Sequence, residues 1–144
     1  MKKRTVLIFF TLILLVLSIA ALPVMAAPKP SGPTITWTNA PQNNVIYLHV
    51  GESYTLNLQV TSATKFASAT AKPDTQFPGK GIFYSGTDRA TNATSATLHL
   101  TMTGKQPTDS LPGGYVPASA FVGVKYGNGN TVVKQFDFQV VVTP

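Results

Sequence analysis

Strict alternation of apolar and polar residues is the feature that most constrains how this chain can fold. Four segments carry it: residues 54–61, 96–103, 120–126 and 136–143. Successive side chains of a β-strand point to opposite faces, so a period of two predicts half-buried strands with one face in a core and the other in water. No period of 3.6, which would indicate helices, is sustained after the first 26 residues. The sequence therefore predicts an all-β fold.

Shorter apolar runs between these segments supply the remaining strands. They lie at residues 34–38, 45–50, 65–71 and 81–84. Residues 127–130, Gly-Asn-Gly-Asn, predict a tight hairpin, because glycine and asparagine tolerate positive φ. Residues 104–117 contain three prolines and three glycines and form the longest predicted connection. Seven to eight short strands predict a single antiparallel β-sandwich, since two sheets must cover each other's apolar faces.

The start of the chain differs in composition from the rest. Three basic residues precede an uncharged apolar stretch at residues 6–22, and small residues surround a predicted cleavage point after Ala26. This order is typical of a secretory signal peptide, so we expect a signal helix over residues 1–26. The alternative is an uncleaved membrane anchor. A spanning helix needs about 20 apolar residues, whereas this stretch supplies 17 before Pro23. Export to the extracellular space or the cell surface is therefore predicted.

The leader also accounts for much of the positive charge. The whole chain has 11 basic and five acidic residues, which gives a formal net charge of +6. Three of the basic residues lie in the leader, which leaves eight against five, or +3. So small and scattered a charge predicts no nucleic-acid partner. The rest of the chain divides into a proline-rich linker at residues 27–33 and one domain at residues 34–144.

Catalytic and metal-binding chemistry is hard to assemble from this composition. No cysteine occurs, which excludes disulfides, zinc-thiolate sites and thiol nucleophiles. The acidic residues are well separated, and His49 and His99 occupy the outward phase of their predicted strands, where we expect them to face solvent. No serine lies in a Gly-x-Ser-x-Gly turn. We therefore predict a protein without catalytic residues, resident metal or cofactor.

A polar loop predicted at residues 85–92 contains oxygen ligands of the kind that calcium binds. It offers a single carboxylate, Asp88, beside Arg89, whereas tight calcium sites combine several carboxylates. We predict a hydrogen-bonded turn there, with a weak calcium site near Asp88 as the alternative.

Two parts of the sequence resemble bacterial immunoglobulin-like domains of the Big type. Residues 45–60 read VIYLHVGESYTLNLQV, an apolar strand followed by a Gly-acidic turn and an alternating strand. Residues 120–142, AFVGVKYGNGNTVVKQFDFQVVV, are similar to the final hairpin of such domains. The resemblance implies an immunoglobulin-like sandwich used for binding, adhesion or spacing outside the cell. The antibody-type pattern is not followed, because the cysteine pair is absent and Trp37 lies in the first predicted strand instead of the third.

Amphipathic aromatic residues are the remaining candidates for contact with a partner. Exposed rings on one sheet can stack against sugar faces, as in carbohydrate-binding modules. The candidates for glycan or partner contacts are Trp37, Tyr47, Tyr84 and Tyr115. In the competing interpretation, rings such as Trp37 and Tyr126 cap the core with their polar tips at its rim.

Three functions fit these observations. The first is a non-catalytic binding or adhesion domain whose partner is a cell-surface protein or glycan. The second is a subunit of an extracellular filament, a homopolymer in which residues 34–38 supply a donor strand to a neighbour. The third is a carbohydrate-binding module. Membrane contact is expected only through an uncleaved leader.

Overall fold

The computed structural model describes residues 32–74, 81–85 and 87–144. The expected signal peptide and most of the linker lie outside these residues. Within them, no helix is long and apolar enough to cross a membrane. The elements of the described chain are β1 (Thr34–Trp37), η1 (Gln42–Asn44), β2 (Val45–His49), β3 (Ser53–Pro73), β4 (Ile82–Ser85), β5 (Asp88–Gly104), η2 (Pro112–Gly114), β6 (Val116–Lys125) and β7 (Thr131–Thr143).

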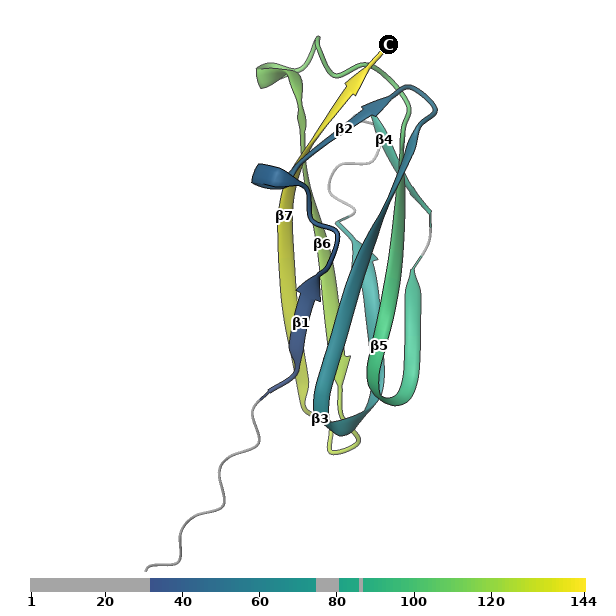
Figure 1. Ribbon diagram of the computed structural model, residues 1–144, viewed down its shortest axis with the longest axis vertical. Helices are drawn as coiled ribbons and strands as arrows, with labels where there is room; N and C mark the ends of the chain where they lie inside the picture. The colour runs from purple at the N-terminus through teal and green to yellow at the C-terminus, as the bar shows by residue number, and fades with distance from the viewer. Residues whose placement is uncertain (1–31, 75–80, 86) are drawn as a thin grey trace, which may run out of the picture. The chain divides into compact units, whose positions relative to one another are not determined.

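The seven strands of the described chain form a β-sandwich, as the sequence predicts (Figure 1). β3 and β5 pair antiparallel along most of their length and form a ribbon on which the other strands are built. The start of β3 pairs with β1, and the end of β5 pairs with β4. From the other half of β3 the sheet continues through β6 and β7 to β2. The strands of both layers of the sandwich therefore belong to one continuous hydrogen-bonded sheet.

Two strands bend where the ribbon passes from one layer to the other. The register of β3 against β5 shifts between Thr61 and Phe66, and Asn92 of β5 has a φ of 53°. Such irregularities bend a strand and increase its local twist. The segments at residues 54–61 and 65–71, which the sequence predicts as separate strands, are consequently two halves of β3.

One pairing and one strand boundary differ from the prediction. β2 lies parallel to β7, with Val45 opposite Gln139, so the sandwich is not purely antiparallel. A parallel pair needs no hairpin, and the two strands lie far apart along the chain. β5 begins at Asp88, inside the predicted polar loop. Its first residues pair with β3, and Ala90 and Ala93 pack against the core, but such small side chains give a weak alternation signal.

The apolar faces of the strands meet in one core. Trp37 of β1 lies with its ring centroid 6.4 Å from that of Phe136 and 5.4 Å from that of Phe138, both on β7. These contacts join strands of different layers. The following inward-facing residues of the four predicted alternating segments are buried: Leu56, Leu58, Val60, Leu98, Leu100, Met102, Ala120, Val122, Val124, Phe138, Val140 and Val142.

Candidate functional site

The four aromatic candidates occupy different settings in the structure. Trp37 is 7 % exposed and packs edge-on to Tyr54 in the core. Tyr47 projects from β2 and is 71 % exposed. Tyr84 on β4 and Tyr115 after η2 are half-buried. Only Tyr47 of the four is mostly exposed, so the candidates do not form one open row of rings; contact of any of them with a glycan stays a prediction.

Tyr84 is a packing residue with an unpaired polar tip. Its hydroxyl is buried and has no hydrogen-bond partner among the described residues. Burial raises the pKa of Tyr84 far above its usual range, and the negative charge of Asp74 raises it further. The hydroxyl therefore stays neutral, and no hydrogen bond to a described residue replaces the hydration that it loses on burial.

Replacing Tyr84 with phenylalanine is expected to raise the free energy of unfolding by about 1 kcal/mol, because the substitution removes a buried hydroxyl that makes no hydrogen bond. Urea unfolding followed by circular dichroism measures the change. Tyr54→Phe is the matched control: the Tyr54 hydroxyl donates to the carbonyl of Asn39, so its loss should lower the stability. A destabilised Tyr84→Phe variant would contradict the burial of an unpaired hydroxyl.

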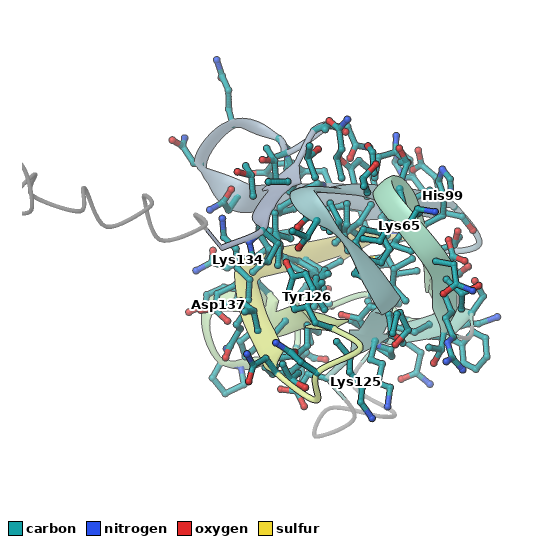
Figure 2. The ribbon with its side chains drawn as sticks, turned by 90° about the horizontal axis from the view of Figure 1, so that it is seen from below. Lys65, His99, Lys125, Tyr126, Lys134 and Asp137 are labelled. Atoms are coloured by element: carbon teal, nitrogen blue, oxygen red, sulfur yellow. The ribbon has the colours of Figure 1, made fainter. Side chains whose placement is uncertain are left out.

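Two adjoining hollows follow β7 and share Asn44 and Asp137 in their walls. One, of about 670 Å³, lies between η1 and strands β6 and β7. The other, of about 460 Å³, lies between β7 and β1. Figure 2 shows Lys134 and Asp137 on the same side of the molecule. We call the two hollows the β7 groove, whose walls include Trp37, Asn43, Asn44, Tyr115, Ser119, Lys134, Gln135, Phe136, Asp137 and Gln139.

Tyr115 is held at the groove by the loop that precedes it. Gly113 has a φ of 80°, and a Cβ placed there would lie 2.7 Å from Cε1 of Tyr115, so the ring packs directly on the backbone. Thr108 anchors the same loop to β7. Its backbone N–H donates to the carbonyl of Val142, and its hydroxyl donates to the carbonyl of Gly114. The buried Thr108 thus fixes the loop that presents Tyr115.

Asp137 is the acidic group of the groove. Its Oδ1 accepts hydrogen bonds from Oγ of Ser119 at 2.7 Å and from Nε2 of Gln135 at 2.6 Å. The first of these bonds and then the second lower the pKa of Asp137 below its usual range, so the carboxylate is ionised at neutral pH. Oδ2 has no hydrogen-bond partner among the described residues. The carboxylate therefore has a fixed orientation and one free acceptor oxygen.

Asn43 and Asn44 form the opposite wall. Their φ angles are 56° and 55°, in the left-handed region that asparagine adopts more readily than most residues. The N–H of Asn44 donates to the carbonyl of Pro41 and closes the turn. Strained backbone of this kind is concentrated at functional sites. Consecutive asparagines after a proline, between two apolar runs, are the signal from which the sequence could have predicted this wall.

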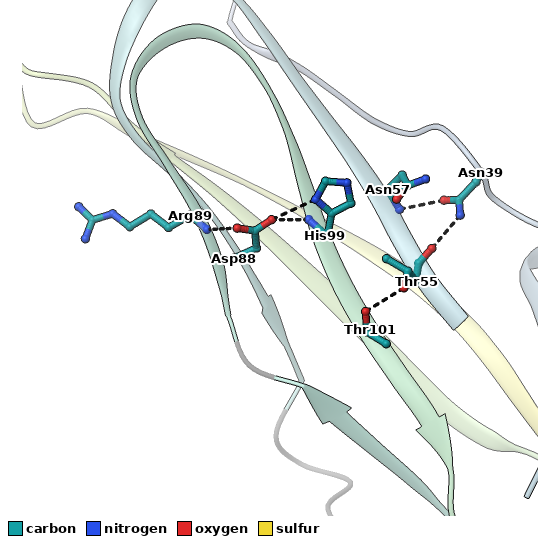
Figure 3. Close-up of polar contacts among 7 residues, drawn as sticks. All are labelled: Asn39, Thr55, Asn57, Asp88, Arg89, His99 and Thr101. Carbon is teal, nitrogen blue, oxygen red and sulfur yellow. Dashed lines mark hydrogen bonds and ion pairs between the residues drawn. The ribbon is translucent and has the colours of Figure 1, made fainter. Parts of the chain in front are cut away.

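An asparagine side chain covers an open strand edge where β1 ends (Figure 3). Oδ1 of Asn39 accepts from the N–H of Asn57 at 2.8 Å, and its Nδ2 donates to the carbonyl of Thr55 at 2.7 Å. The side-chain amide thereby continues the pairing of β1 with β3. Covered edges of this kind oppose the addition of a foreign strand.

Asp88 covers the edge of β5 in a similar way (Figure 3). Its Oδ2 accepts from the N–H of His99 at 2.6 Å, and its Oδ1 accepts from the N–H of Arg89 at 2.8 Å. The exposed imidazole of His99 lies 3.4 Å from Oδ2. A calcium ion at Asp88 would compete with these bonds. No group of three metal-ligating side chains occurs in the part of the chain that the structure describes.

Acid is expected to weaken the fold partly through Asp88. The hydrogen bond from the His99 backbone is the main cause that lowers the pKa of Asp88 in the folded state. Its stabilising contribution is therefore complete above the pKa of an unfolded aspartate, about 3.9, and is lost as the pH falls through the folded value. The free energy of unfolding, measured from neutral pH to about pH 3, should fall less steeply for Asp88→Asn than for the wild type. Equal slopes would show that this contact does not stabilise the ionised carboxylate.

Comparison with known proteins gives likenesses only among solved structures. No family model and no curated protein matches this sequence. The major pilin subunit BcpA of Bacillus cereus is 13 % identical with a TM-score of 0.48, over 78 % of this chain and 41 % of that one. A mutant of the SrpA adhesin of Streptococcus sanguinis is 18 % identical with a TM-score of 0.44, over 81 % and 61 %. Murine CRIg is 9 % identical with a TM-score of 0.44, over 79 % and 100 %.

Proposed function

We propose that this protein is an exported, non-catalytic domain that binds a partner outside the cell or at the cell surface through the β7 groove. The observation that carries the proposal is the convergence of polar groups from η1, β6 and β7 on one concave surface. Ligand sites share this combination of a concave shape and a few fixed polar groups. The leader-like residues 1–26 supply the expected location.

Binding is favoured over catalysis by the chemistry of the groove. Among the described residues that line it, Asp137 is the single carboxylate and no histidine occurs. A general acid at neutral pH needs a raised pKa, whereas hydrogen bonds lower the pKa of Asp137. The groove therefore offers an ionised acceptor fixed in position, which suits recognition.

Filament assembly by strand donation is the second candidate. It is favoured by the outer edge of β5 at residues 90–93, which pairs with no second strand within the described residues and lies beyond the N–H of Arg89 that Asp88 covers. The position of β1 weighs against it. Ile35 and Trp37 are 3 % and 7 % exposed in their own domain, so donation would require both to leave this core and be replaced from a neighbour.

Binding assays on a panel of extracellular proteins and glycans test the proposal. The full-length protein should bind at least one member, and Tyr115→Ala and Gln139→Ala should weaken that binding about tenfold or more. Tyr47→Ala, an exposed ring outside the groove, is the matched control and should leave binding unchanged. Binding that depends on Tyr47 and not on the groove, or turnover of a bound member, would contradict the proposal. Regular polymers in electron micrographs would favour the filament.

A further inference from the structure

We propose that the β7 groove binds a neutral oligosaccharide chain. The inference rests on the proposed function and adds to it the chemical class of the ligand. It is carried by the mixture of hydrogen-bonding groups, the one fixed carboxylate and the aromatic walls of the groove.

The polar walls suit a ligand rich in hydroxyl groups. Asn43, Asn44 and Gln139, which carry side-chain amides, line the larger hollow together with Ser119. Amides and hydroxyls both donate and accept, which is what sugar hydroxyls also do. The turn at Asn43 and Asn44 is held in an uncommon conformation, so these amides are presented by a defined backbone.

Asp137 adds one strong acceptor to these neutral groups. Both hydrogen bonds that it accepts from described residues use Oδ1, which leaves Oδ2 for a ligand. A hydroxyl that donates to an ionised carboxylate makes a hydrogen bond about twice as strong as a neutral pair. Because Ser119 and Gln135 fix the carboxylate, little side-chain freedom is lost when a ligand binds.

Aromatic walls complement the apolar faces of sugar rings. Tyr115 packs on Gly113 and lines the larger hollow, and Trp37 and Phe136 line the smaller one. Trp37 contributes little surface, so Tyr115 is the ring on which recognition should depend most. Tyrosine supplies apolar contact area and a polar tip with few rotatable bonds.

The charges of the groove select against acidic sugars. Asp137 would repel a carboxylate or sulfate. Lys134 is the single cation among the lining residues that the structure describes. Its Nζ donates to the carbonyl of Ile35 at 2.7 Å and lies 5.0 Å from the ring centroid of Phe136. A ligand anion would have to displace these contacts. Two hollows with shared walls also suit a chain better than a single sugar.

An extended peptide is the competing ligand, because residues 131–138 of β7 pair with β6 and with no second strand of the described chain. The side chain of Lys134 opposes it. By reaching from β7 to the carbonyl of Ile35 on β1, this side chain crosses the space that an added strand would occupy. The structure therefore favours the saccharide.

Isothermal titration calorimetry of the purified full-length protein tests the inference. The probes are short neutral oligomers of glucose, N-acetylglucosamine, mannose and galactose, with oligogalacturonate as the acidic comparison and an extended threonine-rich peptide as the competitor. At least one neutral series should bind. Tyr115→Ala and Asp137→Asn should each weaken it about tenfold or more, and Tyr47→Ala should leave it unchanged. Asp137→Asn preserves size, and thermal unfolding confirms that each variant is folded.

Three results would overturn the inference: no binding of any neutral series, tighter binding of oligogalacturonate than of neutral chains, or an unchanged affinity in Asp137→Asn. Peptide binding that depends on Tyr115 would overturn the saccharide ligand and leave the proposed function standing. Loss of every groove-dependent interaction across the wider panel would overturn both.

Discussion

Replacing Trp37 with alanine is expected to lower the free energy of unfolding by about 3–5 kcal/mol. The indole contacts three rings, those of Tyr54, Phe136 and Phe138, at centroid distances of 6.5, 6.4 and 5.4 Å. Its Nε1 also donates to Oδ1 of Asn39 at 2.9 Å. Truncation would leave a cavity between the two layers, which the surrounding strands can fill only in part. Urea unfolding measured by circular dichroism gives the difference.

Tyr47→Ala is the control for this prediction and should change the stability by less than about 0.5 kcal/mol, because the ring is largely exposed. The wild-type unfolding midpoint should also be independent of protein concentration, since β1 completes its own domain. A loss below about 1 kcal/mol for Trp37→Ala would contradict the core position of the ring. A midpoint that rises with concentration would indicate that β1 is exchanged between copies.

Replacing Gly104 with alanine is expected to destabilise the fold by about 1–3 kcal/mol. A Cβ there would lie 2.8 Å from the carbonyl oxygen of His49 and 2.9 Å from Cγ1 of Val142. The backbone cannot easily move away. The N–H of Gly104 donates to the carbonyl of Glu52, and its carbonyl accepts from the N–H of Gly51. These hydrogen bonds hold the end of β5 in place where β2 and β7 approach it. Thermal or urea unfolding measures the loss of stability in the variant.

Gly123→Ala is the matched control on β6. No atom of the described residues lies within 4 Å of a Cβ built on Gly123. In a strand, alanine is favoured over glycine by about 0.5–1 kcal/mol on entropic grounds, so this variant should be neutral or slightly stabilised. If Gly104→Ala changed the stability as little as Gly123→Ala, the result would contradict the close approach of β2 to the end of β5.

The strands and the core could be predicted because the two faces of a strand appear in the local sequence as an alternation of apolar and polar residues. Leu56, Leu58 and Val60 alternate with polar residues, and all three are fully buried. The same rule predicted that His99 faces solvent, which the structure confirms. Where side chains are small this alternation is weaker, which is why residues 85–92, which include Ala90 and the start of β5, are predicted as a loop.

The arrangement of the strands could not be predicted from local patterns. The parallel pairing of β2 with β7 joins residues about ninety positions apart, such as Val45 and Gln139. Alternation is equally compatible with parallel and antiparallel neighbours, so it carries no signal for this choice. The merging of two predicted strands into β3 likewise depends on the bend at residues 61–66.

The groove could be predicted only in part. Tyr115 and Trp37 were aromatic candidates, and both line it. Asp137 has no local signal beyond the polar phase of the segment at residues 136–143, because its role depends on Ser119, which reaches it through a tertiary contact. Thr108 gives no local signal either, since its hydrogen bonds to Val142 and Gly114 exist only in the folded chain.

The claim that the β7 groove is the binding surface is tested most directly by a ¹H–¹⁵N NMR titration. The purified protein is titrated with the tightest binder of the panel, and the shift changes of backbone amides are mapped onto the fold. We predict the largest changes at Asn43, Asn44, Tyr115, Asp137 and Gln139. Largest changes around Tyr47 or His99, with the groove amides unmoved, would contradict the claim.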